Sequence, residues 1–342
     1  MPALKILFIV SLFNNERTIQ ESLEAILNQK GKAEKNILVV DDQSADESLN
    51  KTSALAEKFP CLRILRQKHQ GQALALNLGL KKAQDQDYDF IALVEADVKI
   101  APCWLEKNLQ VFAKKLSSRV NGAIMGVGGL LHPFPDDSWI ARIAGYEIAY
   151  KMEHQKKQVK HLTSANVIYR SAVFKKIGLF REDLRNSAFD AEFNQRVRNA
   201  GFRLIYNRKA QAHHHYKPTV FLFLKRAYAY AYFRPALKIA ALYPYDRVIQ
   251  IQIFILAIFP FLFLLFIFAH HHLLIICSCL LAIIYFISTL PPLVWTLKNK
   301  KDPVILLYPL INFLRNLAAI FGLTLGIARK TRKSYAKNSQ KF

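Results

Sequence analysis

Acidic residues follow apolar runs at two places in this sequence and open a polar segment at a third. Asp41 and Asp42 end the run LVVDD, Glu95 and Asp97 end IALVEAD, and Asp190 opens FDAEFNQRVRNAG. Burying such carboxylates for structure alone is costly, because a charged group loses its hydration inside a protein. We therefore expect the three sites to converge on one cleft.

The types and spacing of these carboxylates suggest distinct roles. An Asp at the mouth of a parallel sheet can accept hydrogen bonds from a nucleobase or a ribose, which suits Asp41 and Asp42. The spacing of Glu95 and Asp97 can hold Mg²⁺ or Mn²⁺, with diphosphate oxygens completing the coordination. Such a cation stabilises a departing nucleoside diphosphate as a Lewis acid. Asp190 is then the candidate general base that takes a proton from an attacking hydroxyl.

Each candidate also has a purely structural interpretation. Asp42 fits a turn residue and Asp190 fits a helix N-cap, because short carboxylates accept nearby backbone N–H groups. Asn166 in HLTSANVIY fits an acceptor-site residue, but an ordinary residue at a strand end explains it more simply. Trp104 and Trp139 fit core or rim packing better than a platform for a sugar ring.

The first hundred residues alternate apolar runs with helical stretches, which predicts a β-α-β-α order. We expect strands at 6–10, 37–40, 62–65 and 90–94, and helices at 18–28, 46–58 and 72–83. Continuous apolar strands joined by helices favour an α/β fold with a parallel sheet covered on both faces. Ligands bind beyond the carboxyl ends of such strands, where the acidic residues lie.

Later elements are less regular. We expect a Gly-rich strand at 123–131, a helix at 139–153 and another at 190–200. Thr18 with Glu21, and Ser44 with Glu47, have the spacing of capping boxes, in which side chains satisfy the free amides of a helix's first turn.

The composition of the last third of the chain predicts a membrane region. The segments 248–269 and 273–297 are apolar and long enough to span about 30 Å at about 1.5 Å per residue. The run 304–327 contains Asn312, Arg315 and Asn316, and a central Arg costs about 2.5–3.5 kcal/mol on insertion scales. We expect it to be a third span or a re-entrant or interfacial segment, or Arg315 to be paired within the bundle. Residues 219–247 favour interfacial amphipathic helices.

The formal net charge of +23 is compatible with nucleic acid, an anionic membrane or an acidic substrate. Basic residues gather beside the apolar runs, at 298–301 and in the tail 329–342, which favours a cytoplasmic membrane face. No nucleic-acid-binding signature is visible, so we expect no nucleic-acid partner.

The four cysteines form no CxxC pair, and we expect no disulfide framework. The apolar start at 4–13 fits a buried first strand better than a secretory signal.

The order and spacing of the motifs together resemble a known family. The segments ILFIVSLFNNERTIQESLEAILNQ, VVDDQSADES, HQGQALALNLGLKKAQ, DFIALVEADV and FDAEFNQRVRNAGFRL, from about residue 4 to 206, look like family 2 glycosyltransferases of the GT-A fold. The resemblance implies inverting transfer from a UDP- or GDP-linked sugar with Mn²⁺ or Mg²⁺. It adds Ser11, Phe13, Glu16 and Gln72 to the nucleotide-sugar-binding residues. Similar enzymes often place a His near the metal, which makes His214 a further candidate ligand among His213 to His215.

The chain departs from the family pattern at several positions. Ser11 replaces a Pro, Phe13 replaces a Tyr, and Gln72 stands where many members have a basic residue. Glu95 replaces the first Asp of the DXD motif, so Asp97 is the more secure metal ligand. Phe189 stands where many members have the acid that precedes the base.

These observations predict a GT-A domain at 1–218, interfacial helices at 219–247, a membrane region at 248–328 and a basic tail at 329–342. The apolar hairpin resembles family members that build polysaccharides or lipid-linked glycans. We expect sugar transfer to a hydroxyl of such an acceptor by a multi-pass protein of the inner (plasma) membrane, with the catalytic domain cytoplasmic. A QxxRW motif is not visible after Tyr216, which favours a non-processive enzyme. The alternatives are a polyprenyl-phosphate glycosyltransferase and a catalytically silent membrane-bound nucleotide-sugar-binding protein.

Overall fold

The computed structural model describes residues 3–84, 86–113, 122–184, 188–237, 243, 245–269 and 272–339. The chain forms two compact units, a sheet unit (1–134 and 155–215) and a helical unit (135–154 and 216–342). The boundary at 215 is close to the predicted 218, but residues 135–154 belong to the helical unit. Residues 270–271 between the first two predicted apolar segments, residues 238–242 and 244 of the predicted interfacial segment, and the end of the basic tail at 340–342 lie outside the described residues.

Within the described residues of the sheet unit, eight strands form one mixed sheet in the order β3-β2-β1-β4-β7-β6-β8-β5. The strands β1 to β4 are parallel, while β7 lies antiparallel between β4 and β6. This mixed sheet confirms the predicted α/β class. The bounds are β1 Leu4–Leu12, β2 Ala33–Asp41, β3 Leu62–Arg66, β4 Phe90–Val94, β5 Val98–Ile100, β6 Ile124–Pro133, β7 Asn166–Arg170 and β8 Arg203–His214.

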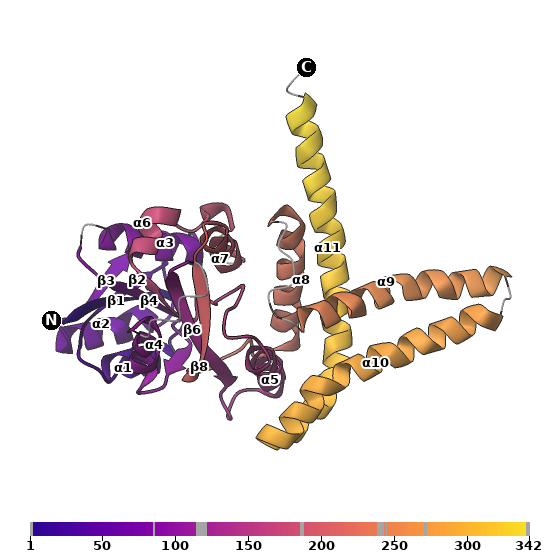
Figure 1. Cartoon of the computed structure of the whole chain (residues 1–342), viewed down its shortest axis with the longest axis horizontal. Helices are drawn as coiled ribbons and strands as arrows, with labels where there is room; N and C mark the ends of the chain where they lie inside the picture. The colour runs from indigo at the N-terminus through magenta and orange to yellow at the C-terminus, as the bar shows by residue number, and fades with distance from the viewer. Residues whose placement is uncertain are drawn as a thin grey trace. The chain divides into compact units, whose positions relative to one another are not determined.

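Helices cover both faces of this sheet. Figure 1 shows α3, α6 and α7 on one side and α1, α2 and α4 on the other. The central strands β1 and β4 are therefore buried, as their apolar sequences require. The bounds are α1 Ile19–Leu27, α2 Ser48–Lys58, α3 Gln72–Ala83, α4 Trp104–Ala113, α6 Ala172–Ile177, the 3-10 helix η1 Glu182–Leu184 and α7 Phe189–Asn199.

The strand β8 is not predicted from the sequence, because a bulge interrupts its pattern. Gly129 of β6 pairs with Asn207, and the next residue of β6, Leu130, pairs with Gln211. Residues 208–210 are therefore additional on β8. Gly129 permits this packing, since a Cβ there would lie 2.0 Å from the carbonyl oxygen of Ala210.

The helical unit contains α5 Trp139–Glu153, α8 Val220–Leu237, α9 Asp246–Ala269, α10 His272–Lys300, the 3-10 helix η2 Pro303–Leu307 and α11 Tyr308–Ser339. The helices α9 and α10 pack as a hairpin, and α8 lies along α11 (Figure 1). In the described part of the chain, two helical segments are long and apolar enough to cross a membrane, His272–Lys300 and Pro303–Arg329. The second corresponds to the predicted run 304–327.

Buried charges connect α5 to the other helices of this unit. Arg315 of α11 is buried and donates hydrogen bonds to Glu147 and to Asn312. Lys151 lies 2.7 Å from Glu147 and 3.3 Å from Asp246. Burial alone would raise the pKa of Glu147, but the charges of Arg315 and Lys151 outweigh burial and hold this pKa below its ordinary value. Arg315 is therefore paired, as one of the alternatives for the third apolar run expected, but its partner Glu147 lies on α5 and not in the predicted membrane region.

Candidate active site

The carboxylate of Asp42 organises the loop that leads from β3 into α3. It is buried just beyond the end of β2, and its two oxygens accept three hydrogen bonds. The donors are the side-chain amide of Gln67 at 2.7 Å and the backbone N–H groups of Gln70 and Gly71, each at 2.8 Å. Asp42 is therefore a turn residue, and it lies at the carboxyl edge of the sheet where a nucleotide is expected.

An aromatic pair lies beside this loop. Phe13 is 42% exposed and stacks on the ring of His69, with ring centroids 4.2 Å apart. The Nδ1 atom of His69 is 2.9 Å from Oδ2 of Asp42. Ser11 is half-buried near the end of β1, and Asp41 is fully buried at the end of β2. The structure thus brings the predicted base-binding residues to one edge, together with His69, which the sequence did not single out.

Polar side chains tie the β1–α1 loop to the start of α2. Glu16, predicted to bind the nucleotide sugar, accepts the backbone N–H of Glu47 through Oε2 at 3.2 Å. The hydroxyl of Ser44 accepts the N–H of Asn14 at 3.1 Å. Thr18 precedes α1 but makes no capping hydrogen bond through its side chain. The two predicted capping boxes are therefore wrong, because α2 begins later than predicted and these side chains serve the loop instead.

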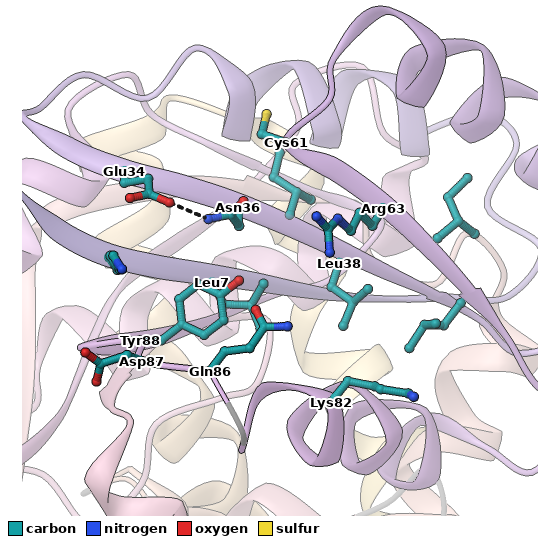
Figure 2. A pocket seen from close by; sticks show the side chains of 14 residues that line it. Leu7, Glu34, Asn36, Leu38, Cys61, Arg63, Lys82, Gln86, Asp87 and Tyr88 are labelled. Atoms are coloured by element: carbon teal, nitrogen blue, oxygen red, sulfur yellow. Dashed lines mark hydrogen bonds between the residues drawn. The ribbon is translucent and has the colours of Figure 1, made fainter.

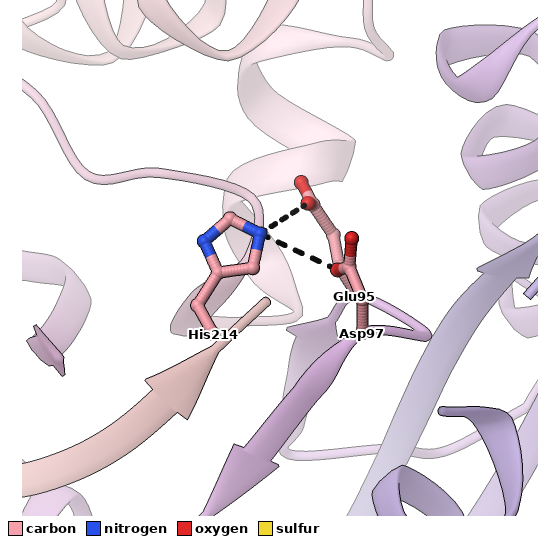
Figure 3. Close-up of side chains that lie close together, drawn as sticks. All are labelled: Glu95, Asp97 and His214. Atoms are coloured by element: carbon pink, nitrogen blue, oxygen red, sulfur yellow. Dashed lines mark ion pairs between the residues drawn. The ribbon is translucent and has the colours of Figure 1, made fainter. Parts of the chain in front are cut away.

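A candidate metal site lies between β4, β5 and β8. The ligand atoms of Glu95, Asp97 and His214 all lie within 4.8 Å of one another, and Figure 3 shows the imidazole turned toward both carboxylates. The Nε2 atom of His214 is 3.4 Å from Oδ1 of Asp97 and 3.8 Å from Oε2 of Glu95. The pairing of Val98 with His214 brings these residues together although they are far apart in the sequence.

The separations in this cluster suit a small divalent cation. Two ligands of one Mg²⁺, each at about 2.1 Å, are at most about 4.2 Å apart. The two distances from Nε2 of His214 fall within that limit. Two carboxylates and one imidazole fit Mn²⁺ or Mg²⁺ better than a thiophilic metal, because these cations prefer oxygen ligands.

The neighbouring histidines face a different group. The ring of His215 stacks on Phe134, with centroids 3.8 Å apart, and His213 lies 5.3 Å from the same ring. Side chains alternate between the two faces of a strand, so His214 turns toward the acidic pair while its neighbours turn away. Of the three histidines, the structure therefore identifies His214 as the candidate ligand.

Two side chains hold the remaining oxygen of Glu95. Its Oε1 atom accepts hydrogen bonds from Nε2 of Gln72 and from Oγ of Ser164, each at 3.0 Å. Glu95 therefore presents Oε2 to the cluster, while Oε1 is fixed by neutral donors. Gln72 stands at the first position of α3, where a basic residue would instead form an ion pair.

Asp190 lies close to this arrangement. It is the second residue of α7, and the N-cap position belongs to Ala188. Its Oδ1 accepts the N–H of Ala191 at 2.8 Å, and its Oδ2 accepts the N–H of Ser164 at 3.4 Å. The Nε2 atom of His161 is 3.7 Å from Oδ2. The backbone of Ser164 thus contacts the candidate base, and its hydroxyl contacts Glu95.

Three other candidates lie outside this arrangement of groups. Trp104 and Asn166 are fully buried, and the indole N–H donates to the side-chain carbonyl of Asn166. Asn166 in turn donates to the backbone carbonyl of Leu130. Both residues therefore have a structural role in the core, as their simpler interpretation predicted. Trp139 begins α5 in the helical unit and is 42% exposed.

A cavity of about 400 Å³ is lined by the first part of β1, by β2 up to Leu38, and by β3 (Figure 2). Its lining mixes opposite charges, including Lys5, Arg63 and Lys82 with Glu34 and Asp87. Because the acidic candidates lie at the carboxyl ends of the strands, this cavity is separate from the candidate active site.

Two known glycosyltransferases are similar in sequence to this chain. The chain is 25% identical over 336 residues to the dolichyl N-acetyl-α-D-glucosaminyl phosphate 3-β-D-2,3-diacetamido-2,3-dideoxy-β-D-glucuronosyltransferase of Methanococcus voltae, a match that covers 94% of this chain and 96% of that protein. It is 27% identical over 125 residues to the dolichol-phosphate mannosyltransferase of Pyrococcus furiosus, covering 36% of this chain and 33% of that protein.

A solved structure and a family model agree with the observed fold. The mannosyltransferase PcManGT from Pyrobaculum calidifontis, solved with GDP-Man and Mn²⁺, superposes with a TM-score of 0.59 at 15% identity, covering 94% of this chain and 88% of that one. At this identity the likeness shows the GT-A fold alone. The model of glycosyl transferase family 2 matches residues 7–178, half of the chain. The chain therefore belongs to glycosyl transferase family 2.

Proposed function

We propose that the protein is a metal-dependent, inverting glycosyltransferase that moves a sugar from a nucleoside-diphosphate donor to a hydroxyl of a lipid-linked or polysaccharide acceptor. One observation carries this proposal. Ser164 donates from its hydroxyl to Glu95 and from its backbone to Asp190, so the candidate metal cluster and the candidate base share one hydrogen-bonding residue. A donor diphosphate held at the cluster would then have its anomeric carbon near Asp190.

Donor binding is assigned to the carboxyl edge of the sheet. Phe13 would receive the base beside the loop that Asp42 organises, while Asp97, His214 and Glu95 would hold Mn²⁺ or Mg²⁺. The cation supplies charge neutralisation for the departing diphosphate. The oxygen-rich ligand set and the separations within it support this assignment.

The chemical step is assigned to Asp190. Its carboxylate takes the proton of the acceptor hydroxyl as that oxygen attacks the anomeric carbon. The new carbon–oxygen bond forms on the face opposite the bond to the diphosphate, which breaks, and the nucleoside diphosphate leaves with the bonding electrons. A single displacement of this kind inverts the anomeric configuration. The backbone N–H groups of Ala191 and Ser164 orient the carboxylate for this role.

Several observations support the proposed acceptor and location. The relative from Methanococcus voltae, matched over nearly its whole length, is named as acting on a dolichyl-phosphate-linked sugar. Two segments of this chain are candidate membrane spans, with basic residues at 298–301 and in the tail. Two crossings in succession would return the tail, which has six Lys and Arg residues against three at 298–301, to the side of the sheet unit. The positive-inside rule therefore favours the cytoplasmic face of the plasma membrane for the sheet unit of a multi-pass protein. The missing QxxRW motif supports one sugar per encounter.

A polyprenyl-phosphate glycosyltransferase is the second candidate. The match to a dolichol-phosphate mannosyltransferase favours it, although that match covers about a third of each chain. A phosphate acceptor is already ionised and needs little help from a general base. Asp190→Asn therefore separates the two functions, because activity would be lost with a hydroxyl acceptor and retained with a phosphate acceptor.

The test is nucleotide release by the purified full-length protein. UDP- and GDP-linked sugars are supplied with membrane lipid extract as acceptor, in Mn²⁺ or in EDTA. We expect release with one donor class, its loss in EDTA and its loss in Asp97→Asn. Asp87→Asn, which removes an exposed carboxylate elsewhere on the same unit, is the matched control and retains activity. Donor binding without turnover in Mn²⁺ would instead identify a catalytically silent protein.

A further inference from the structure

A groove on the sheet unit gathers positive charge away from the candidate active site. Its volume is about 380 Å³, and it lies between α4, the segment that follows α5, and β8. The residues that line it include Lys107, Lys157, Arg208 and Lys209, and among the described lining residues there is no carboxylate. The groove therefore presents a concentrated positive potential, which attracts an anionic partner.

The bulge of β8 builds one wall of this groove. Asn207 fixes its start, donating from Nδ2 to the carbonyl of Lys107 at 2.9 Å and accepting the N–H of Lys209 at 3.3 Å. Ala210 ends it against Gly129, where no side chain would fit. The exposed Arg208 and Lys209 therefore stand on a fixed backbone, which lowers the entropy lost when they bind.

The sequence connects this groove directly to the helical unit. Gln155 and Lys157 line the groove and follow immediately on α5, which ends at Glu153. Within the helical unit, Tyr146 of α5 donates to Asp302 at 2.7 Å, and Asp302 lies between the two candidate spans in the sequence. A short covalent link thus joins the groove to a helix that contacts the connection between those spans.

We propose that this groove docks on an anionic phospholipid surface. The proposal rests on the membrane attachment in the proposed function. A tethered domain meets lipid headgroups at a high effective concentration, so several weak contacts suffice. Basic side chains near a surface of anionic lipid are each attracted to it, and Lys107, Lys157, Arg208 and Lys209 supply four such charges. Docking would hold the sheet unit at the membrane surface, where a lipid-linked acceptor is available.

Lysine acetylation of the full-length protein in nanodiscs tests the proposal. Phosphatidylcholine discs are compared with discs that contain one-third phosphatidylglycerol, and labelling at each lysine is followed by mass spectrometry. We expect Lys107, Lys157 and Lys209 to react about fivefold more slowly on the anionic discs. Exposed lysines elsewhere on the sheet unit serve as internal controls and should not change; these are Lys30, Lys32, Lys58 and Lys175. The protection should disappear in about 1 M NaCl, where the Debye length is about 3 Å.

Two charge-matched variants sharpen the test. Lys156 is exposed beside the groove and reports on docking when the groove itself is altered. Its protection should be lost in the quadruple variant K107Q/K157Q/R208Q/K209Q and retained in K30Q/K32Q/K58Q/K175Q. Metal-dependent nucleotide release by both variants verifies that the candidate active site is folded.

Equal labelling on the two kinds of disc would overturn the proposal, as would protection by soluble heparin without protection by anionic lipid. That second result would indicate a nucleic acid or an acidic glycan as the partner. Failure of the proposed function is distinguishable, because it appears as absent nucleotide release while labelling of the groove is unaffected. Failure of the membrane attachment appears separately, as failure to incorporate into discs of either composition.

Discussion

Replacement of Ser164 by Ala tests the arrangement of the candidate active site most directly. The change removes the hydroxyl that donates to Glu95 at 3.0 Å and leaves the backbone N–H that contacts Asp190. A hydrogen bond to a charged group contributes about 1.5–3 kcal/mol, which corresponds to roughly 10- to 150-fold in an equilibrium or a rate. Gln72 still donates to the same oxygen of Glu95, so we expect the lower end, about tenfold in kcat/KM.

The assay is nucleotide release as a function of the Mn²⁺ concentration. The half-saturating Mn²⁺ concentration should rise, because the carboxylate of Glu95 is then less well oriented toward His214. The pH dependence of kcat should be unchanged, since Asp190 keeps its backbone partners. Ser171→Ala is the matched control, because the Ser171 side chain makes no capping hydrogen bond to α6.

The double variant Ser164→Ala/Gln72→Ala extends this argument. Both side chains donate to Oε1 of Glu95, so their effects should not be additive: the second loss should cost more than the first. Full activity of Ser164→Ala at low Mn²⁺ would refute the reasoning, since the oxygen would then need no fixed orientation. A change in the pH dependence of kcat without a change in the half-saturating Mn²⁺ concentration would refute it as well, because Ser164 would then act on Asp190 alone.

Three further predictions concern stability. Gly129→Ala should destabilise the sheet unit by about 1–3 kcal/mol, because the new Cβ would lie 2.0 Å from the carbonyl oxygen of Ala210; thermal unfolding of the purified protein measures this, and an unchanged midpoint would contradict it. Arg315→Met should cost about 3–5 kcal/mol by removing one of the two basic partners, Arg315 and Lys151, seen beside the buried Glu147 in the described residues, and adding Glu147→Gln should recover part of that loss in the same assay. The folded pKa of Glu147 lies below its ordinary value of 4.5, so its contribution to the free energy of unfolding is present above about pH 4.5 and is lost as the pH falls through the folded pKa. Glu147→Gln should therefore reduce the fall of the unfolding midpoint at acid pH. An unchanged slope of the midpoint against pH would contradict the assignment.

The helices and strands in the first half of the sheet unit were predictable from the sequence, because the local hydrophobic pattern and the order of the elements indicate the same structure there. The helix α3 at Gln72–Ala83 and the strand β4 at Phe90–Val94 have the predicted bounds. Once the strands are taken as parallel, their carboxyl ends must share one edge, so the position of Asp42 and of the acidic pair Glu95 and Asp97 at that edge follows from topology. The approximate place of the site was therefore predictable from strand order alone.

The finer parts of the site depend on elements that leave no signal in the sequence. The choice among three histidines stayed open because β8 was not recognised, and alternation along that strand separates His214 from His213 and His215. Ser164 is a small polar residue before β7, a kind of residue that is common at strand ends. His69 reaches the site through contacts with Phe13 and Asp42, and contacts between two loops have no local sequence pattern.

The helical unit shows why a single sequence divides domains incompletely. Order along the chain assigns α5 to the catalytic domain, because strands of the sheet precede and follow it. Its buried charges belong elsewhere: Glu147 pairs with Arg315, 168 residues further along the chain. An Arg in an apolar run signals that a partner is required, since an unpaired charge there is costly. The identity of that partner depends on a contact between distant residues, and neither composition nor periodicity carries that information. The buried ion pair with Glu147 thus explains both how Arg315 is accommodated in the third apolar run and why α5 belongs to the helical unit.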